Sequence, residues 1–483
     1  MPAELQVILA GLPILLLAGL LLSRIPPIPA VLATIGVTLA LGFWFPMSVS
    51  SAGEITRLLL PVTISVALII FGGVLLAQFL AVSGGQDRIG DWVSAAANSP
   101  ERAVLLIGLG VSPLAESIIG WGAGVFISVP LLLRIGLTAT KAATVGLLGL
   151  VLAPWGSLGP GIILMSEVSG VSTRDIGLWS AILTLPVLLI MGAAISLVGM
   201  GMRTAWSMSG ETLMTVLTMG VTVIVLNAWV SVPLAGVLAS FAGMACVLFF
   251  SRLRGGPLLR LPQDTLSSLA PYLVLTIGLL AMTGFTAIVD LGQWGDILVS
   301  PALWLLLAAA SAPFFLSITH IHRIIAARQA VRLFVPVSVI TLLFITFGGI
   351  VVANGMSSTL ADTAANLGSG VLLAVPLIGS VGGYITGSNT ATGAMFARGI
   401  AEAAHAVGVS PGLLLGSQNV ATGVAVMAAP GRVALSVNMV NSLRRDGEAP
   451  VDTARVLMTV LAANLALLVA LTPLTWFLGT GLG

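Results

Sequence analysis

The sequence predicts an all-α, polytopic membrane bundle with two inverted repeats, each containing a re-entrant helical hairpin. Of the 483 residues, 58% are hydrophobic and only 7% are charged, whereas soluble domains contain roughly 25% charged residues. Apolar runs of about 18 to 25 residues recur along the chain, and each can cross a hydrocarbon core of about 30 Å as a helix. We therefore expect about 11 to 14 spans or half-spans, inserted in a lipid bilayer.

A repeated pattern of prolines and glycines indicates two copies of one plan. The stretch "LPVTISVALIIFGGVLLAQFL" at 60–80 matches "VPVSVITLLFITFGGIVVANGM" at 335–356, and "GWGAGVF" at 120–126 matches "TATGAMF" at 390–396. An Ala-Pro pair recurs in each copy, at Pro154 and at Pro430. Chance similarity in an alphabet of small apolar residues is the alternative. Secondary transporters are commonly built from such repeats, with substrate bound where the halves meet.

These matches suggest a division of the chain. The expected parts are N-terminal scaffold spans at 1–56, a first repeat at 57–200, connecting spans at 201–330, a second repeat at 331–440 and a C-terminal span at 441–483.

The distribution of basic residues predicts that the two copies are inverted. Short loops rich in Lys and Arg stay cytoplasmic. If Arg24 is inside, one span places Arg57 outside, whereas its counterpart Arg332 belongs to a basic loop expected inside. The two copies then cross the membrane in opposite senses.

Each copy contains a polar, glycine-rich interruption between apolar runs. These are "SPLAESIIGWGAG" at 112–124 and "GYITGSNTATGAMF" at 383–396. Backbone leaves the helix inside a membrane only where it is buried in protein or lines a watery cavity. We expect re-entrant hairpins near 113–130 and near 370–397. The alternative is that the small polar residues are tight helix-packing positions.

A hairpin tip opens a half-helix whose free amides and positive dipole end can hold an anion. Hydroxyl and amide side chains add donors, and glycine lets a ligand approach the backbone. Arg432 follows a Pro-Gly break, and its guanidinium fork suits a carboxylate, although it could equally mark a packing interface. The expected substrate-binding residues are Ser117, Gly120, Gly122, Gly124, Thr386, Gly387, Ser388, Asn389, Thr390, Gln418, Asn419 and Arg432. The expected cavity-lining residues are Trp121, Trp155, Ser157, Tyr384 and Thr422.

Glu116 is the only acid between Glu101 and Glu167 and has apolar neighbours. Placing an acid at the centre of a membrane costs roughly 2.5 to 3.5 kcal/mol on insertion scales, so this carboxyl group should be easily protonated. We expect Glu116 to carry a coupling proton. A neutral glutamic acid, or one that stabilises the hairpin from a helix N-terminus, is the alternative.

Other function classes are disfavoured. The sequence offers no nucleophile with a base, no metal-ligand cluster and no phosphate loop, so we expect neither an enzyme nor a cofactor or metal. No nucleic-acid partner is expected. The coupling ion is predicted to be H⁺, with Na⁺ as the alternative, and the protein is expected to be a monomer or homodimer.

Five segments resemble, in order, the hallmark segments of the L-lactate permease family. They are "PLAESIIGWGAG", "APWGSLGPGIILMSEVSGVS", "GMSSTLAD", "YITGSNTATGAMFA" and "VGVSPGLLLGSQN". The resemblance covers about residues 60 to 440. It implies a multi-pass symporter of the bacterial inner membrane that imports lactate, glycolate or related 2-hydroxymonocarboxylates together with protons. The chain departs from the family at Asn389, because the family usually has an acidic "GSDTSS" tip there.

More distantly, the paired hairpins and the Ser-Asn-Thr at 388–390 resemble divalent-anion sodium symporters. This resemblance implies a scaffold and a moving transport domain, as in an elevator mechanism. A sodium-coupled carboxylate or dicarboxylate transporter and an anion channel are the alternative functions.

Overall fold

The computed structural model describes residues 2–23, 25–120, 122–256, 260–443 and 450–481. Within these ranges the secondary structure is helical, with no β-strand. Ten of the described helices are long and apolar enough to cross a membrane, and three shorter apolar helices accompany them at Pro27–Phe43, Ala123–Arg134 and Pro301–Phe315. The predicted all-α, polytopic fold is confirmed.

The N-terminal part pairs two helices and then extends into a long one. The elements are α1 (Ala3–Leu22), α2 (Pro27–Ala40), η1 (Leu41–Phe43), α3 (Val49–Val82) and α4 (Gly85–Ala96). Helix α3 begins where the Ser48 hydroxyl accepts the amide of Ser51 at 3.0 Å, an N-cap that satisfies one free donor.

The next part is broken into short helices. It comprises α5 (Pro100–Leu106), the π-helical turn η2 (Ile107–Val111), α6 (Ser112–Ile118), α7 (Ala123–Arg134), α8 (Ala139–Leu148), the 3-10 turn η3 (Ala153–Leu158), α9 (Pro160–Ser169) and the long α10 (Thr173–Met200). Pro160 is suited to the first position of α9 because that position needs no amide donor.

The connecting part contains α11 (Met202–Ser207), α12 (Ser209–Trp229), α13 (Ala235–Leu253), α14 (Gln263–Thr286), α15 (Gln293–Leu298) and α16 (Pro301–Phe315). Helix α12 packs against both α10 and α13, whereas α16 packs against α3 and α14 packs against α4 and α16.

The final part repeats the pattern of a long helix followed by short ones. It comprises α17 (His320–Ala353), α18 (Met356–Ala365), η4 (Gly368–Gly370), α19 (Val371–Thr386), α20 (Asn389–Ala406), α21 (Pro411–Val426), α22 (Pro430–Leu443) and the C-terminal α23 (Thr453–Gly481). Helix α17 packs along α3, and α20 packs along α9.

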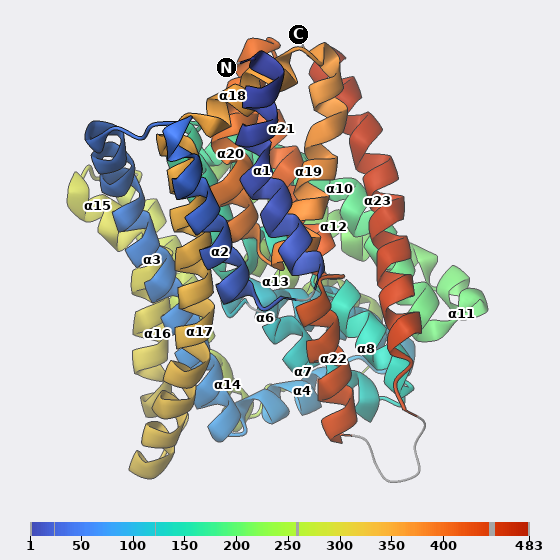
Figure 1. The fold of residues 1–483 in the computed structure, drawn as a ribbon. Helices are drawn as coiled ribbons and strands as arrows, with labels where there is room; N and C mark the ends of the chain where they lie inside the picture. The colour runs from blue at the N-terminus through green and yellow to red at the C-terminus, as the bar shows by residue number, and fades with distance from the viewer. Residues whose placement is uncertain (1, 24, 121, 257–259, 444–449, 482–483) are drawn as a thin grey trace.

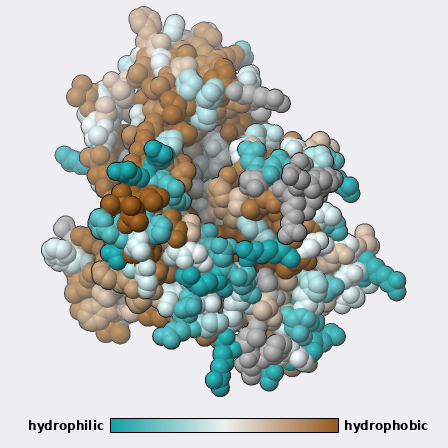
Figure 2. Space-filling model, turned by 90° about the horizontal axis from the view of Figure 1, so that it is seen from below, coloured by the Kyte–Doolittle hydropathy of each residue, from teal (hydrophilic) through white to brown (hydrophobic). Residues whose placement is uncertain are grey.

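Both termini lie at one end of the bundle (Figure 1). Helices α19, α20 and α21 occupy the half of the molecule near that end, whereas α7, α8 and α22 occupy the opposite half. Seen from the end opposite the termini, the surface carries hydrophilic residues across its middle and apolar residues over much of the remainder (Figure 2). The inversion of the repeats and the re-entry of the hairpins stay predictions.

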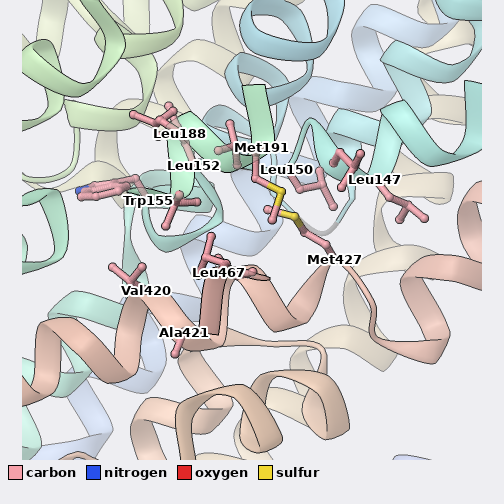
Figure 3. Packing of buried hydrophobic residues seen from close by; sticks show 14 of the residues in the cluster. Leu147, Leu150, Leu152, Trp155, Leu188, Met191, Val420, Ala421, Met427 and Leu467 are labelled. Carbon is pink, nitrogen blue, oxygen red and sulfur yellow. The ribbon is translucent and has the colours of Figure 1, made fainter. Parts of the chain in front are cut away.

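A continuous apolar core joins the broken helices to the long ones. Figure 3 shows part of it, formed by residues of the α8–η3 segment, α10, α21 with the residues that follow it, and α23: Leu147, Leu150, Leu152, Trp155, Leu188, Met191, Val420, Ala421, Met427 and Leu467. By contrast, large apolar side chains such as Leu15, Phe314 and Val469 are 69%, 80% and 65% exposed. A lipid bilayer would cover such a surface.

Helices α19 and α21 approach closely through glycines. A Cβ atom on Gly379 would lie 2.6 Å from the carbonyl oxygen of Gln418, and one on Gly383 would collide with that of Thr422. Small residues let membrane helices pack with their backbones in contact. Helix α19 is thus held closely against α21.

Candidate functional site

The carboxylate of Glu116 holds the tip between α6 and α7. Gly120 (φ 71°) and Gly122 (φ 90°) adopt left-handed conformations that glycine reaches readily. Glu116 is 3% exposed, and its carboxylate accepts the amides of Gly122 at 2.9 Å and Gly124 at 3.4 Å. These are amides that the start of α7 would otherwise leave free.

A Thr-Gly-Ser turn forms the tip between α19 and α20. Gly387 is left-handed (φ 65°) and ends α19. The Ser388 hydroxyl caps α20 by accepting the amide of Ala391 at 3.2 Å, and the Thr386 hydroxyl accepts the amide of Ser388 at 3.1 Å. The hydroxyl groups of the turn therefore bind backbone amides of the turn and of the first turn of α20. The first amides of α20 lie at the tip.

The break between α8 and α9 lies against the first tip. Gly156 and Ser157 leave helical geometry, and the Ser157 hydroxyl donates to the carbonyl of Ile119 at 2.7 Å. Gly161 contacts the second tip, because a Cβ on it would lie 3.2 Å from the Cβ of Asn389. This break therefore bridges the two tips.

A second break, between α21 and α22, supplies the cation. Helix α22 begins at Pro430, which places Arg432 in its first turn. Arg432 Nη2 lies 3.7 Å from Glu116 Oε1, and the two side chains are 12% and 4% exposed. Arg432 Nη1 has no hydrogen-bond partner among the described residues. A Cβ on Gly122 would collide with this nitrogen, so the guanidinium group lies directly against the first tip.

Both tips and both breaks meet around a cavity of about 50 Å³, larger than the roughly 10 to 15 Å³ that one water needs. Its only charged lining residues, within the described ranges, are Glu116 and Arg432. The full lining is Glu116, Gly120, Ala153, Pro154, Gly156, Ser157, Pro160, Gly161, Gly387, Ser388, Asn389, Thr390, Val426 and Arg432.

Helix N-termini add positive potential to this cavity. Helices α9 and α20 begin at the lining residues Pro160 and Asn389, and α7 begins beside Gly122. The dipole of each N-terminus favours negative charge, although the amides at the start of α7 already donate to Glu116. Together with the arginine, they make a site suited to a small anion.

Several predicted binding residues lie behind the second tip and outside the cavity lining. The Asn389 side-chain amide donates to Asn419 Oδ1 at 2.9 Å, and the Asn419 amide donates to Ser180 Oγ at 3.0 Å. Gln418 Nε2 donates to the carbonyl of Thr392 at 3.2 Å. Asn419 and Gln418 thus position the tip, and Thr386 acts within the turn itself.

Three predicted lining residues lie elsewhere. Trp155 is fully buried in the core, and its indole N–H donates to Asn227 Oδ1 at 3.3 Å. The Thr422 hydroxyl donates to the carbonyls of Gly379 and Gln418, which binds α21 to α19. Tyr384 is partly buried and packs against the main apolar cluster.

The remaining predicted residues belong to the first tip. Ser117 faces α13, because a Cβ on Gly236 would lie 2.5 Å from its hydroxyl oxygen. Gly124 packs against Ser112 and Leu150 and meets the site through its amide alone. Trp121 lies outside the described residues.

Six lining residues were missed from the sequence: Ala153, Pro154, Gly156, Pro160, Gly161 and Val426. Most belong to "APWGSLGPG", whose density of glycine and proline indicates a break. The glycines and prolines themselves could have been chosen as lining, since a break exposes backbone rather than side chains.

These features define a multi-pass membrane protein with a cavity suited to a small anion, and comparison with known proteins supplies its family. A sequence model of L-lactate permease matches residues 6–256 and 282–472. The chain belongs to the L-lactate permease family, whose members are permeases and not enzymes.

Individual relatives are distant. An L-lactate permease of Streptococcus iniae is 23% identical over 380 residues, which cover 71% of this chain and 78% of the relative. One from Salmonella typhi is 32% identical over 95 residues, and this match spans only 17% of the relative's length. A crystal structure of the YdaH transporter of Alcanivorax borkumensis is 16% identical, with a TM-score of 0.42 over 86% of this chain and 85% of that one.

Proposed function

We propose that this protein imports a small monocarboxylate, such as lactate, glycolate or a similar 2-hydroxy acid, together with protons across the bacterial inner membrane. The observation that carries the proposal is Arg432, whose side chain is only 12% exposed and whose buried Nη1 atom has no partner among the described residues at a cavity lined by helix N-termini. A buried cation with free hydrogen-bonding capacity is costly unless an anion completes it. Membership of the L-lactate permease family favours a lactate-like anion.

The substrate carboxylate would bind between Arg432 and the start of α20. A guanidinium group recognises a carboxylate through two parallel donors, and the free amides of the second tip add further donors. Ser388 and Thr390 line the same cavity, and their hydroxyl groups suit the 2-hydroxyl group of the substrate. Glu116 lies 3.7 Å from Arg432 at the same cavity and would carry the coupled proton.

The arrangement of the hairpin ends supports re-entry from opposite faces. Arg134, at the end of α7, pairs with Asp87 and Asp91 of α4, the helix immediately before α5. These contacts are expected if the two ends of the first hairpin lie at one level. Gly399, in the second half of α20, lies against Ser357 of α18, close to the segment that leads into α19.

Transport would then proceed by an elevator motion. The moving unit would contain both hairpins and both broken helices, and the other spans would form the scaffold. The proposed division into repeats at 57–200 and 331–440, scaffold spans at 1–56, connecting spans at 201–330 and a last span at 441–483 follows from this role.

The direct test is uptake of labelled lactate and glycolate into proteoliposomes that contain the purified protein, with a pH gradient or a sodium gradient imposed separately. We expect accumulation with the pH gradient alone and collapse of accumulation on adding a protonophore. Accumulation that requires sodium would instead establish a sodium-coupled carboxylate transporter. Flux that only equilibrates, whatever gradient is imposed, would indicate an anion channel.

A further inference from the structure

Glu116 and Arg432 form a pair that is close but incompletely bonded. The separation of 3.7 Å between Arg432 Nη2 and Glu116 Oε1 is within ion-pair range but longer than a hydrogen bond of about 2.7 to 3.2 Å. The Glu116 oxygens instead accept the amides of the first tip. The guanidinium group of Arg432 thus lies near the Glu116 carboxylate and also lines the cavity that the second tip borders.

Building on the proposed function, we propose that Glu116 and the substrate carboxylate share Arg432, so that only one of the two is negatively charged at a time. When Glu116 is ionised, it neutralises Arg432 and the cavity needs no substrate. When Glu116 is protonated, Arg432 lacks a counter-charge and binds the substrate carboxylate. Proton and substrate therefore occupy the carrier together.

Counting charges shows why this pairing couples the two fluxes. The empty carrier with ionised Glu116 is neutral at the cavity, and so is the loaded carrier with protonated Glu116. The two mixed states carry a net charge, positive when only the proton is bound and negative when only the substrate is bound. Since an uncompensated charge at the centre of a membrane costs roughly 2.5 to 3.5 kcal/mol on insertion scales, the neutral states cross preferentially.

Other charged groups around this pair are engaged elsewhere or lie away from the cavity. Helix α6 packs against η2, α7, η3 and α13, whose charged residues are Arg134, paired with Asp87 and Asp91, and Arg252, bonded to the carbonyl of Gly256. On the lining helices, Arg398 pairs with Glu402 in the second half of α20. Glu167 of α9 is exposed.

Helix α22, which carries Arg432, also packs against α8 and α23. The charged residues of these two helices, Lys141 and Arg455, lie in the first turns. The cavity lies beyond the opposite end of α8.

The test is proton uptake on lactate binding, measured by titration calorimetry of the purified protein in buffers of different ionisation enthalpy. At a pH where Glu116 is ionised, we expect about one proton taken up per lactate bound, and an affinity that falls about tenfold per pH unit as pH rises. The Glu116→Gln variant should bind lactate with no proton uptake and no pH dependence. Glu167→Gln, the same change at an exposed position of α9, should behave as the wild type.

The possible failures are distinguishable. Lactate binding without proton uptake by the wild type would overturn the shared arginine and leave the transported anion in place. Wild-type protein that binds neither lactate nor glycolate would overturn the proposed function itself. The wild-type titration needs no variant, so a Glu116→Gln protein that fails to fold does not remove the test.

Transport by the same variant provides a second readout. Glu116→Gln should retain lactate–lactate exchange, because its loaded state is neutral. It should lose net uptake, because its empty state keeps an uncompensated Arg432. Glutamate acting only as a cap on α7 would reduce exchange and net uptake equally, and pH-driven accumulation by this variant would overturn the proposal.

Discussion

At the scale of single residues, the site depends on a contact between two residues that are far apart in the sequence. Glu116 could be singled out from the sequence because it is an isolated acid among apolar neighbours. Its contact with Arg432 could not be predicted, since the contact depends on how α22 packs against α7. Nor could the sequence show that the Glu116 carboxylate binds the amides of its own tip.

Substitution of Arg432 should selectively remove substrate binding. Truncating one partner of a buried, hydrogen-bonded charge pair costs about 2 to 5 kcal/mol, so Arg432→Gln should weaken lactate binding at least about 30-fold. Arg432→Lys should bind with intermediate affinity, because it keeps the charge and loses the fork. Titration calorimetry measures both.

The matched control is Arg174→Gln, at an exposed arginine in the first turn of α10, which should leave the affinity unchanged. If Arg432→Gln bound lactate as tightly as the wild type, the carboxylate would have to bind elsewhere.

At the scale of elements, the positions of both tips followed from the sequence, but the lengths of their helices did not. The hairpins expected near 113–130 and near 370–397 coincide with α6–α7 and α19–α20, whose second helices continue to Arg134 and Ala406. Glycine and hydroxyl residues mark a turn by their local conformational preferences. The end of an apolar helix, by contrast, is set by neighbouring helices.

Cysteine accessibility tests whether the hairpins re-enter. In a Cys246→Ala background, single cysteines at Ala95 and Thr138 flank the first hairpin, and those at Ser369 and Ala406 flank the second; all four positions are exposed. Because a re-entrant hairpin begins and ends on one face, an impermeant maleimide should label the first pair from one side of the membrane and the second pair from the other.

A control pair calibrates the labelling. Cysteines at Arg174, in the first turn of α10 (Thr173–Met200), and at Met202, just after its end, should react from opposite sides, because α10 is long enough to span. If the residues on either side of one hairpin also reacted from opposite sides, that segment would cross the membrane. It would then not be re-entrant, and the proposed site between two re-entrant tips would be wrong.

At the scale of the whole molecule, the sequence was sufficient to predict a polytopic helical bundle, because recurring continuous apolar runs of about 18 to 25 residues span lipid as helices, whereas barrel strands alternate in polarity. The matched "FGG" motifs at Phe71 and Phe347 lie in α3 and α17, which pack against each other. The cavity lining was less predictable. Trp155 and Thr422 have residue types that suit a cavity, yet the core and the helix backbones take up their polar atoms.

If Glu116 and the substrate share Arg432 as proposed, the transport cycle is electroneutral, with one proton moving per carboxylate. Simultaneous recording of labelled lactate uptake and internal acidification in proteoliposomes, with the membrane potential set by potassium and valinomycin, tests this most directly. The account predicts about one proton per lactate, and a flux that does not change when the potential is imposed, because neutral states do not respond to voltage. Lactate uptake without acidification, or uptake that rises or falls with the imposed potential, would contradict it.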